Sequence, residues 1–202
     1  MNKTQCNSYL KGKDFVNILA RIANFTTNGS HGAFMLFSDP ETTKKRNEAL
    51  GLDSRKNLIE FSEKFDTNKF TKVVNDTIQG IIEDNTLCKD GLTQIHMALV
   101  DSLSNMFQKS KGMREYAEQV AVLITDGEET GDDDPTLQNY IETAERFKQR
   151  KIKVLAIGVG NVDDEFLNIL VQSPQHFFKV DTFDNLVDNL TDMIGAIICK
   201  GM

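Results

Sequence analysis

Two almost wholly apolar stretches constrain the fold of this chain more than any other feature. Residues 120–125 read Val-Ala-Val-Leu-Ile-Thr, and residues 153–159 read Lys-Val-Leu-Ala-Ile-Gly-Val. A strand that is apolar throughout is buried on both faces, as in a parallel sheet covered by helices. Between the two stretches, apolar residues recur at helical spacing over residues 137–147. The pattern therefore predicts a strand–helix–strand unit with a right-handed crossover.

The rest of the chain continues this alternation. We expect further helices over residues 15–22, 70–81, 95–107, 163–171 and 183–198, and further strands over residues 32–37, 58–61 and 176–180. No internal repeat, low-complexity tract or linker divides the sequence. We therefore predict a single α/β domain across residues 1–202, with a doubly wound, mostly parallel sheet and helices on both faces.

Charge and composition exclude several classes of partner. The formal net charge is −7 and the isoelectric point about 5.0, which argues against nucleic acid or an anionic membrane as the partner. No apolar run approaches the roughly 20 residues of a spanning helix, so we expect no membrane insertion. No secretory signal is visible after Met1. Three cysteines exclude a cysteine-dense scaffold and a cysteine-only zinc site. Five N-x-S/T sequons suit glycosylation in a secreted protein, or chance in an Asn- and Thr-rich chain.

The loops at the carboxyl ends of the strands are where an open parallel sheet binds ligands. These are residues 38–39, 89–93, 126–134 and 158–164. Asp126 follows the most apolar strand and Thr93 opens a neighbouring helix. Because Mg²⁺ prefers oxygen ligands, this pair is a candidate half of a magnesium site. The alternative is that Asp126-Gly127 is a plain turn.

Other candidate motifs are incomplete. Gly158-Val159-Gly160 begins a dinucleotide-binding pattern, but the third glycine is replaced by Asp163. No phosphate loop or nucleophile elbow is present, so a nucleotide-using enzyme is a weaker reading. His31, His96 and His176 share no metal-ligand spacing and fit helix-face or surface roles. The run 132–134, Asp-Asp-Asp, is better read as a solvated loop than as a calcium site.

An ordered set of short motifs resembles the von Willebrand factor type A (vWA, integrin I-like) family. It runs through Phe37-Ser38-Asp39, Gly91-Leu92-Thr93, residues 122–127 (Val-Leu-Ile-Thr-Asp-Gly), residues 152–160 and residues 177–183. Each motif alone is weak, but they occur in the family's order over nearly the whole chain. The resemblance implies a Rossmann-like fold and a metal-ion-dependent adhesion site. That site would bind Mg²⁺ or Mn²⁺, with Thr93 and Asp126 as metal ligands and a carboxylate of a protein ligand completing the shell.

One part of the family pattern is missing. The family's D-x-S-x-S motif, which follows a central first strand, has no counterpart before the first helix. Met1 stands about where that motif would have ended. We expect the sequence to be the later part of a longer domain, and the alternative is a divergent module without the site. Either way, a gap is expected in the sheet where the first strand belongs, and the metal site depends on ligands supplied from elsewhere.

The resemblance implies a protein-binding function without catalysis. We expect an extracellular adhesion or matrix-type module, the alternatives being an intracellular assembly subunit or a metal-free structural module. In the implied fold, Cys6 and Cys88 lie toward the site edge and could form a disulfide in an extracellular protein. Cys199 would end the last helix at the opposite edge. Three reduced thiols are the other possibility.

Overall fold

A three-stranded parallel sheet is the centre of the molecule. The computed structural model describes residues 7–37, 44–45, 48–49, 59–83, 93–127 and 135–199. The strands are β1 (Gln119–Thr125), β2 (Ile152–Val159) and β3 (Phe177–Val180), in the spatial order β1-β2-β3. β1 and β2 pair along their whole shared length, from Gln119 opposite Ile152 to Thr125 opposite Gly158. The parallel strand–helix–strand unit predicted from the two apolar stretches is confirmed.

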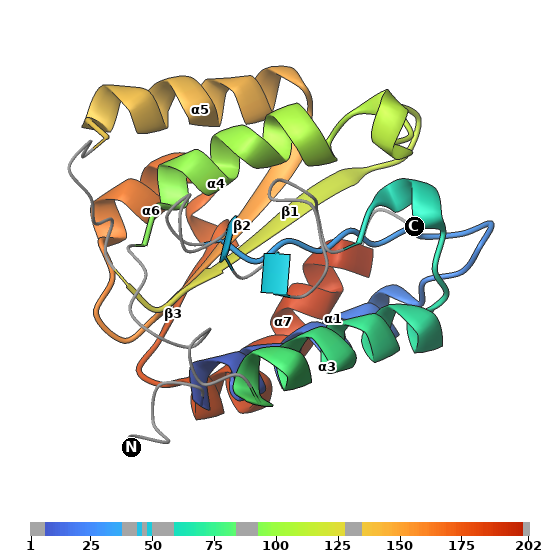
Figure 1. Ribbon diagram of the computed structural model, residues 1–202. Coiled ribbons are helices and arrows are strands. Elements are labelled where there is room, and N and C mark those ends of the chain that lie inside the picture. Colours follow the sequence, from blue (N-terminus) through green and yellow to red (C-terminus); the bar gives the residue numbers. More distant parts are fainter. Residues whose placement is uncertain are drawn as a thin grey trace.

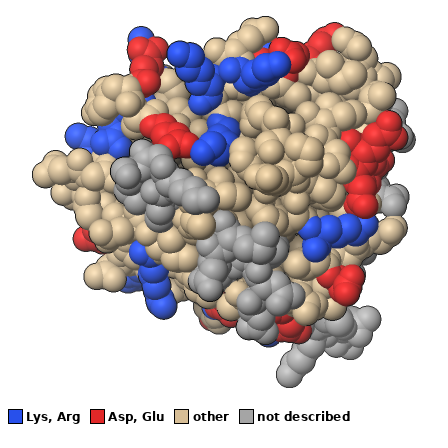
Figure 2. Space-filling model, turned by 180° about the vertical axis from the view of Figure 1, so that it is seen from behind, with Lys and Arg blue, Asp and Glu red and all other residues tan. Residues whose placement is uncertain are grey.

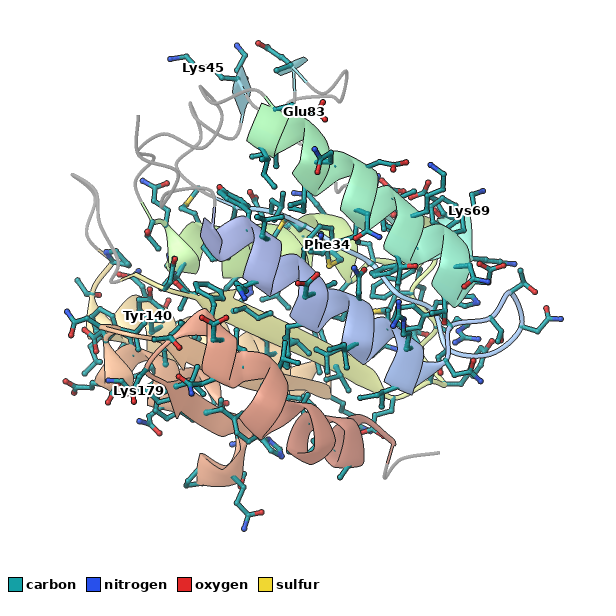
Figure 3. The ribbon with its side chains drawn as sticks, turned by 90° about the horizontal axis from the view of Figure 1, so that it is seen from below. Phe34, Lys45, Lys69, Glu83, Tyr140 and Lys179 are labelled. Carbon is teal, nitrogen blue, oxygen red and sulfur yellow. The ribbon has the colours of Figure 1, made fainter. Side chains whose placement is uncertain are left out.

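Helices cover both faces of this sheet, as the doubly wound prediction required (Figure 1). On one face lie α4 (Ile95–Asp101), α5 (Leu137–Gln149) and α6 (Asp164–Leu170). On the other lie α1 (Asn7–Ala23) and α7 (Phe183–Cys199). α3 (Thr67–Glu83) packs outside α1, so that α1 lies between α3 and α7 (Figure 3). Three-residue 3₁₀ turns lie at Phe61–Glu63, Lys109–Lys111 and Pro174–His176, and a π-helical turn, Ser102–Met106, follows α4.

Three apolar clusters hold these layers together. The first joins α4, α5 and α6 to the sheet, with Tyr140 and Phe147 of α5 fully buried. The second joins α1 and α7 to the opposite face, where Phe15 and Leu186 meet β2 and β3. The third lies between α1, α3 and the extended chain after α1. Because each face of the sheet has its own cluster, the strands must be apolar on both sides.

Local signals in the sequence explain where α5 and α6 begin. Thr136 forms a capping box with Asn139 at the start of α5, which satisfies backbone N–H groups that the first turn leaves unpaired. Asp163 accepts a hydrogen bond from the backbone N–H of Phe166 at 3.1 Å and caps α6. Pro135 lies just before the Thr136 cap and two residues before the first helical residue, Leu137.

The helix predicted over residues 95–107 changes pitch halfway. α4 ends at Asp101 and continues as a wider π-helical turn, Ser102–Met106. The guanidinium of Arg150 donates hydrogen bonds to the carbonyl oxygens of Leu103 and Phe107. Arg150 thus satisfies carbonyl groups at the end of this turn that have no partner inside the helix.

The prediction of two short strands before α3 is wrong. Residues 31–37 are extended, but only Phe34 pairs, in an isolated antiparallel bridge to Ile59 with N···O distances of 3.0 and 3.2 Å. The segment predicted at 58–61 is reduced to this bridge and the following 3₁₀ turn. A β-strand exists only where it has a neighbour to pair with, and no described segment lies within pairing distance of residues 31–37 on the sheet side.

β1 is consequently an edge strand of the described sheet. β2 is buried at every position except Lys153, whereas in β1 only Leu123 and Thr125 are buried. The two strands have equally apolar sequences, so the difference comes from position and not from composition. The gap predicted beside this strand is thus present in the sheet of the described residues. No helix among the described residues is long and apolar enough to cross a membrane.

Candidate functional site

The carboxyl end of β1 brings together the two residues predicted as metal ligands. β1 ends at Thr125, Asp126 and Gly127 form the turn that follows, and Thr93 lies two residues before α4. A Cβ atom placed on Gly127 would lie 2.9 Å from Oγ1 of Thr93. The Thr93 side chain therefore packs directly against the residue after Asp126. β1 and the neighbouring α4 (Figure 1) thus bring Thr93 next to the turn that contains Asp126, which lies 33 positions later in the sequence.

The hydroxyl group of Thr125 holds the turn that follows β1. Thr125 is buried, and its Oγ1 lies 3.4 Å from the Gly127 amide nitrogen and 3.3 Å from the Gly127 carbonyl oxygen. Asp126 is exposed at the tip of this turn. The buried threonine fixes the backbone, and the exposed aspartate presents its carboxylate to the solvent side of the edge. A carboxylate exposed in this way can bind a ligand without first giving up a hydrogen bond or ion pair within the protein.

The donor set at this edge suits a hard divalent cation in part. A threonine hydroxyl and an aspartate carboxylate are both oxygen donors, and Mg²⁺ is commonly held by one or two carboxylates while it keeps several waters. Gly127 allows the hydroxyl of Thr93 to come close, since any side chain there would meet it. Among the residues that the structure describes, no group of three or more His, Cys, Asp or Glu is placed to hold a metal ion. Of the predicted metal ligands, Thr93 and Asp126 lie at this edge.

Other carboxylates near the same edge already have structural partners. Asp163 caps α6, and Asp164 forms an ion pair with Lys179 at 2.8 Å. The glycines of the incomplete dinucleotide pattern also have structural roles. A Cβ on Gly158 would lie 2.5 Å from Cγ2 of Val162, and Gly160 adopts a positive φ of 74°. These positions are needed for close packing and for a left-handed turn, which is sufficient reason for glycine there.

The three histidines are not brought together. His31 lies in the extended segment after α1, with Nε2 3.2 Å from the Thr27 carbonyl oxygen. His96 lies on α4, with Nε2 3.1 Å from Oγ1 of buried Thr143, and contacts the Tyr140 ring. Burial lowers the pKa of His31 and of His176, and neighbouring cationic side chains lower both further. Each histidine therefore belongs to a separate packing environment.

Several predicted positions lie outside the described residues. These are Cys6, Cys88 and the sequence motifs at 38–39, 91–92 and 128–134. The backbone of Cys199 ends α7 on the side of the molecule away from the carboxyl ends of the strands, where the resemblance put it (Figure 1). The pairing of Cys6 with Cys88 stays a prediction.

A long groove beside β1 is the feature that sequence reasoning did not identify as a site. It has a volume of about 1160 Å³ and lies between β1 and the extended residues 31–37. α1 closes it on one face of the sheet, and α4 with its π-helical turn closes it on the other. Thr93 and Asp126 line the same groove, so the candidate metal edge lies at its end. One sequence feature could have indicated this groove. Residues 120–125 are apolar on both faces, which calls for a neighbouring strand, and the sequence pattern shows no strand before the first helix.

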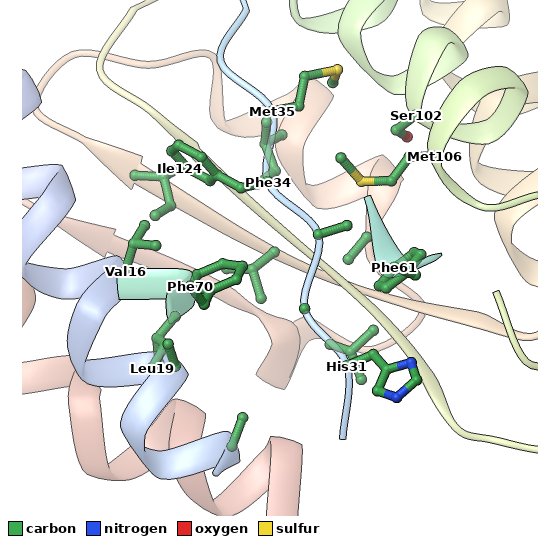
Figure 4. A pocket seen from close by; sticks show the side chains of 18 of the residues that line it. Val16, Leu19, His31, Phe34, Met35, Phe61, Phe70, Ser102, Met106 and Ile124 are labelled. Carbon is green, nitrogen blue, oxygen red and sulfur yellow. The ribbon is translucent and has the colours of Figure 1, made fainter. Parts of the chain in front are cut away.

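The side chains around this groove are mostly apolar (Figure 4). They come from every wall: Val16 and Leu19 of α1, Phe34 and Met35 of the extended segment, Ile124 of β1 and Met106 of the π-helical turn. On the molecular face in Figure 2, by contrast, acidic and basic side chains are interspersed and neither sign forms a continuous patch.

Comparisons with known proteins agree with the family resemblance of the sequence motifs. A sequence model described as the von Willebrand factor type A domain matches residues 48–192. The collagen alpha-1(XII) chain of Notophthalmus viridescens is 28% identical over 133 residues, which cover 63% of this chain and 13% of that protein. Human matrilin-1 is 30% identical over 97 residues, covering 46% of this chain and 18% of that protein. The chain thus spans less than a fifth of the length of these relatives.

Solved structures with the same fold include two that hold a metal. Proximal thread matrix protein 1 from the mussel byssus matches over 98% of this chain and 44% of that chain, with a TM-score of 0.74 and 19% identity. The same protein with a zinc-occupied MIDAS motif matches with a TM-score of 0.72 and 19% identity, at the same coverage of both chains. Manganese-loaded TRAP protein of Plasmodium vivax matches over 91% of this chain and 65% of that chain, with a TM-score of 0.58 and 16% identity. With its family match over most of its length and its doubly wound parallel sheet, the chain belongs to the von Willebrand factor type A domain family.

Proposed function

We propose that this chain is a non-enzymatic, protein-binding module of the extracellular-matrix type. Its ligand would offer a carboxylate to a divalent cation, Mg²⁺ or Mn²⁺, held in part by Thr93 and Asp126. The observation that carries the proposal is the contact of Thr93 with the turn that contains Asp126, at the carboxyl edge of the sheet. That edge is where open parallel sheets bind their ligands.

The chemistry of the edge favours binding over catalysis. A hydroxyl and a carboxylate can hold a hard cation, and the cation's open positions can accept a carboxylate oxygen from a partner. A carboxylate-bearing protein surface is therefore the ligand chemistry that these two side chains suit.

The relatives support the matrix setting. Both curated relatives described above carry names of collagen and matrilin chains, and the mussel protein is named as a thread matrix protein. The chain has a net charge of −7, so its surface repels an acidic partner. A cation between the two acidic groups removes this repulsion, which favours a cation-mediated contact over direct contact with an acidic ligand. We propose extracellular localisation on the same grounds.

The metal part of the proposal is tested with Mn²⁺ as a paramagnetic probe of the complete 202-residue chain. Substoichiometric Mn²⁺ should broaden the amide NMR signals of residues 93 and 126–127 first, and added Mg²⁺ should restore them. Asp126→Asn removes the negative charge with little change in shape. It should weaken Mn²⁺ binding at this edge by at least about tenfold, the lower end of what metal-site substitutions cost.

Asp181→Asn is the matched control, because Asp181 is exposed and directly follows β3 as Asp126 follows β1. It should leave the broadening unchanged. A glutamate-containing peptide should then bind only when Mg²⁺ is present, and its glutamine counterpart should not bind. Broadening that is equal in Asp126→Asn and the wild type would show that Asp126 is not a ligand and would overturn the metal assignment.

A further inference from the structure

The loop between α1 and the extended residues 31–37 carries a glycosylation sequon that is open to solvent. Asn28-Gly29-Ser30 is one of the five N-x-S/T sequences of the chain, and residues 26–29 are all exposed. An N-linked glycan is bulky and solvated, so its acceptor has to lie in a surface loop. Asn28 meets this requirement.

Hydrogen bonds fix the shape of this loop without using the Asn28 side chain. The Gly29 amide donates to Oγ1 of Thr26 at 2.7 Å, and the Thr26 amide donates to the Ser30 carbonyl oxygen at 3.1 Å. The guanidinium of Arg114 donates to the Gly29 carbonyl oxygen at 2.7 Å. Asn28 is thus an exposed residue on an ordered loop, and a glycan on it would break none of these bonds.

Arg114 places the loop at the amino edge of the sheet. Its carbonyl oxygen accepts a hydrogen bond of 2.7 Å from the side chain of Gln119, the first residue of β1. Asp126 follows the other end of this seven-residue strand, about 23 Å away at about 3.3 Å per residue. In Figure 1 the loop after α1 projects at the right, whereas β1 ends at the left. A glycan on Asn28 would therefore be attached opposite the edge that carries Thr93 and Asp126.

The sequon that begins at Asn75 is less suitable because it lies inside α3. Side chains two positions apart on a helix do not face each other, so the amide and the hydroxyl of a helical sequon are not presented together. The Asn75 side chain also has a structural partner. Its Oδ1 accepts a hydrogen bond of 2.7 Å from Nδ2 of Asn17, which is only 9% exposed. Asn75 is therefore needed for the contact between α1 and α3.

The sequon that begins at Asn24 is tied to the apolar core. Asn24 follows α1 directly, and the next residue, Phe25, packs against Phe70 with ring centroids 4.9 Å apart. The Phe25 carbonyl oxygen accepts a hydrogen bond of 3.0 Å from the Thr67 amide. An enzyme that takes up this tripeptide would have to pull Phe25 away from both partners. The middle residue of the Asn28 sequon is a glycine and has no side chain in the core.

We propose that Asn28 accepts an N-linked glycan, on the edge of the sheet opposite Thr93 and Asp126. The proposal rests on the extracellular localisation proposed above. In the transfer, Nδ2 of Asn28 attacks C1 of an oligosaccharide carried on a lipid diphosphate. The bond from Nδ2 to C1 forms, and the bond from C1 to the diphosphate oxygen breaks. The lipid diphosphate leaves, and Nδ2 gives up one proton to a base of the transferring enzyme.

The test directs the complete 202-residue chain into the secretory pathway of a cultured eukaryotic cell by an added signal sequence. Protein from the medium and protein retained in the cells are both treated with peptide N-glycosidase in heavy-oxygen water. This enzyme converts a glycosylated asparagine into labelled aspartate, which peptide mass spectrometry locates. Because the signal sequence is supplied, a failure here concerns the acceptor and is distinct from a failure of the proposed function.

The label is expected at position 28. Asn28→Gln and Ser30→Ala should each abolish it, whereas Ser30→Thr keeps the hydroxyl and should retain it. Asn75→Asp is the matched control: it removes a sequon, keeps an oxygen to accept from Asn17, and should leave the label at position 28 in place. An unlabelled Asn28, or a label that survives Ser30→Ala, would overturn the proposal.

The position of the glycan is checked by amide NMR signals of the same chain without metal. Removal of the glycan should shift the signals of residues 26–30 and of Arg114, and leave those of residues 93 and 126–127 unchanged. Shifts at residues 93 and 126–127 of the same size as those at residues 26–30 would contradict a glycan on the opposite edge.

Discussion

At the scale of single residues, Gly127 decides whether Thr93 and Asp126 can share a site. The 2.9 Å separation between Oγ1 of Thr93 and a hypothetical Cβ on Gly127 leaves no room for a side chain. A glycine after a strand is usually explained by turn geometry. Here the closer constraint is the neighbouring threonine, which comes from a segment more than 30 residues earlier in the chain.

We expect Gly127→Ala to lower the free energy of unfolding by about 1–3 kcal/mol, the usual cost of forcing a methyl group into an occupied space. Thr93→Ala removes the hydroxyl and its close contact. In the double variant the penalty should therefore shrink, with a coupling energy of about 0.5–3 kcal/mol. Urea denaturation of the four proteins of this cycle, in EDTA, measures the coupling. If the effects of the two substitutions are strictly additive, a methyl group at position 127 does not contact the Thr93 side chain.

At the scale of elements, the helices were predictable because their signals are local. α3, α5 and α7 have apolar residues at helical spacing, and Asp163 and Thr136 are capping residues placed just before the helices they start. The strand expected at residues 32–37 failed for the opposite reason. Its sequence is suitable, but pairing depends on a neighbour that the described chain does not contain.

The cap of α6 gives a test at this scale. Asp163→Ala should lower the free energy of unfolding by about 0.5–2 kcal/mol, because the Phe166 amide loses its acceptor. Asp163→Asn keeps an acceptor oxygen and should cost much less. Asp181→Ala is the surface control, with an expected change within about 0.5 kcal/mol. Thermal or urea unfolding checks all three, and an equal effect of Ala and Asn at position 163 would contradict the capping role.

At the scale of the whole molecule, the groove brings half-buried apolar side chains of the described residues together beside the edge strand β1. The walls belong to all three apolar clusters, so the groove connects the layers that those clusters hold. A contiguous apolar surface of this kind on a folded protein marks an interaction site or an aggregation risk.

This surface should be visible to a fluorescent apolar dye. We expect ANS to bind the native chain with enhanced emission. A cooperative thermal transition under the same conditions would show that the dye reports a native groove and not a molten state. If the native chain leaves the ANS emission unchanged, the groove is closed in solution.

The sequence by itself determined the fold class, the positions of the helices, the two long parallel strands β1 and β2, and the candidate oxygens of Thr93 and Asp126. All of these follow from local periodicity or from short motifs, and nearby residues carry that information. Only the tertiary structure decided that Thr93 packs against Gly127 and that residues 31–37 pair with Ile59 alone among the described residues. Those outcomes depend on which distant segments reach one another, because strand pairing and close packing are relations between segments and not properties of one.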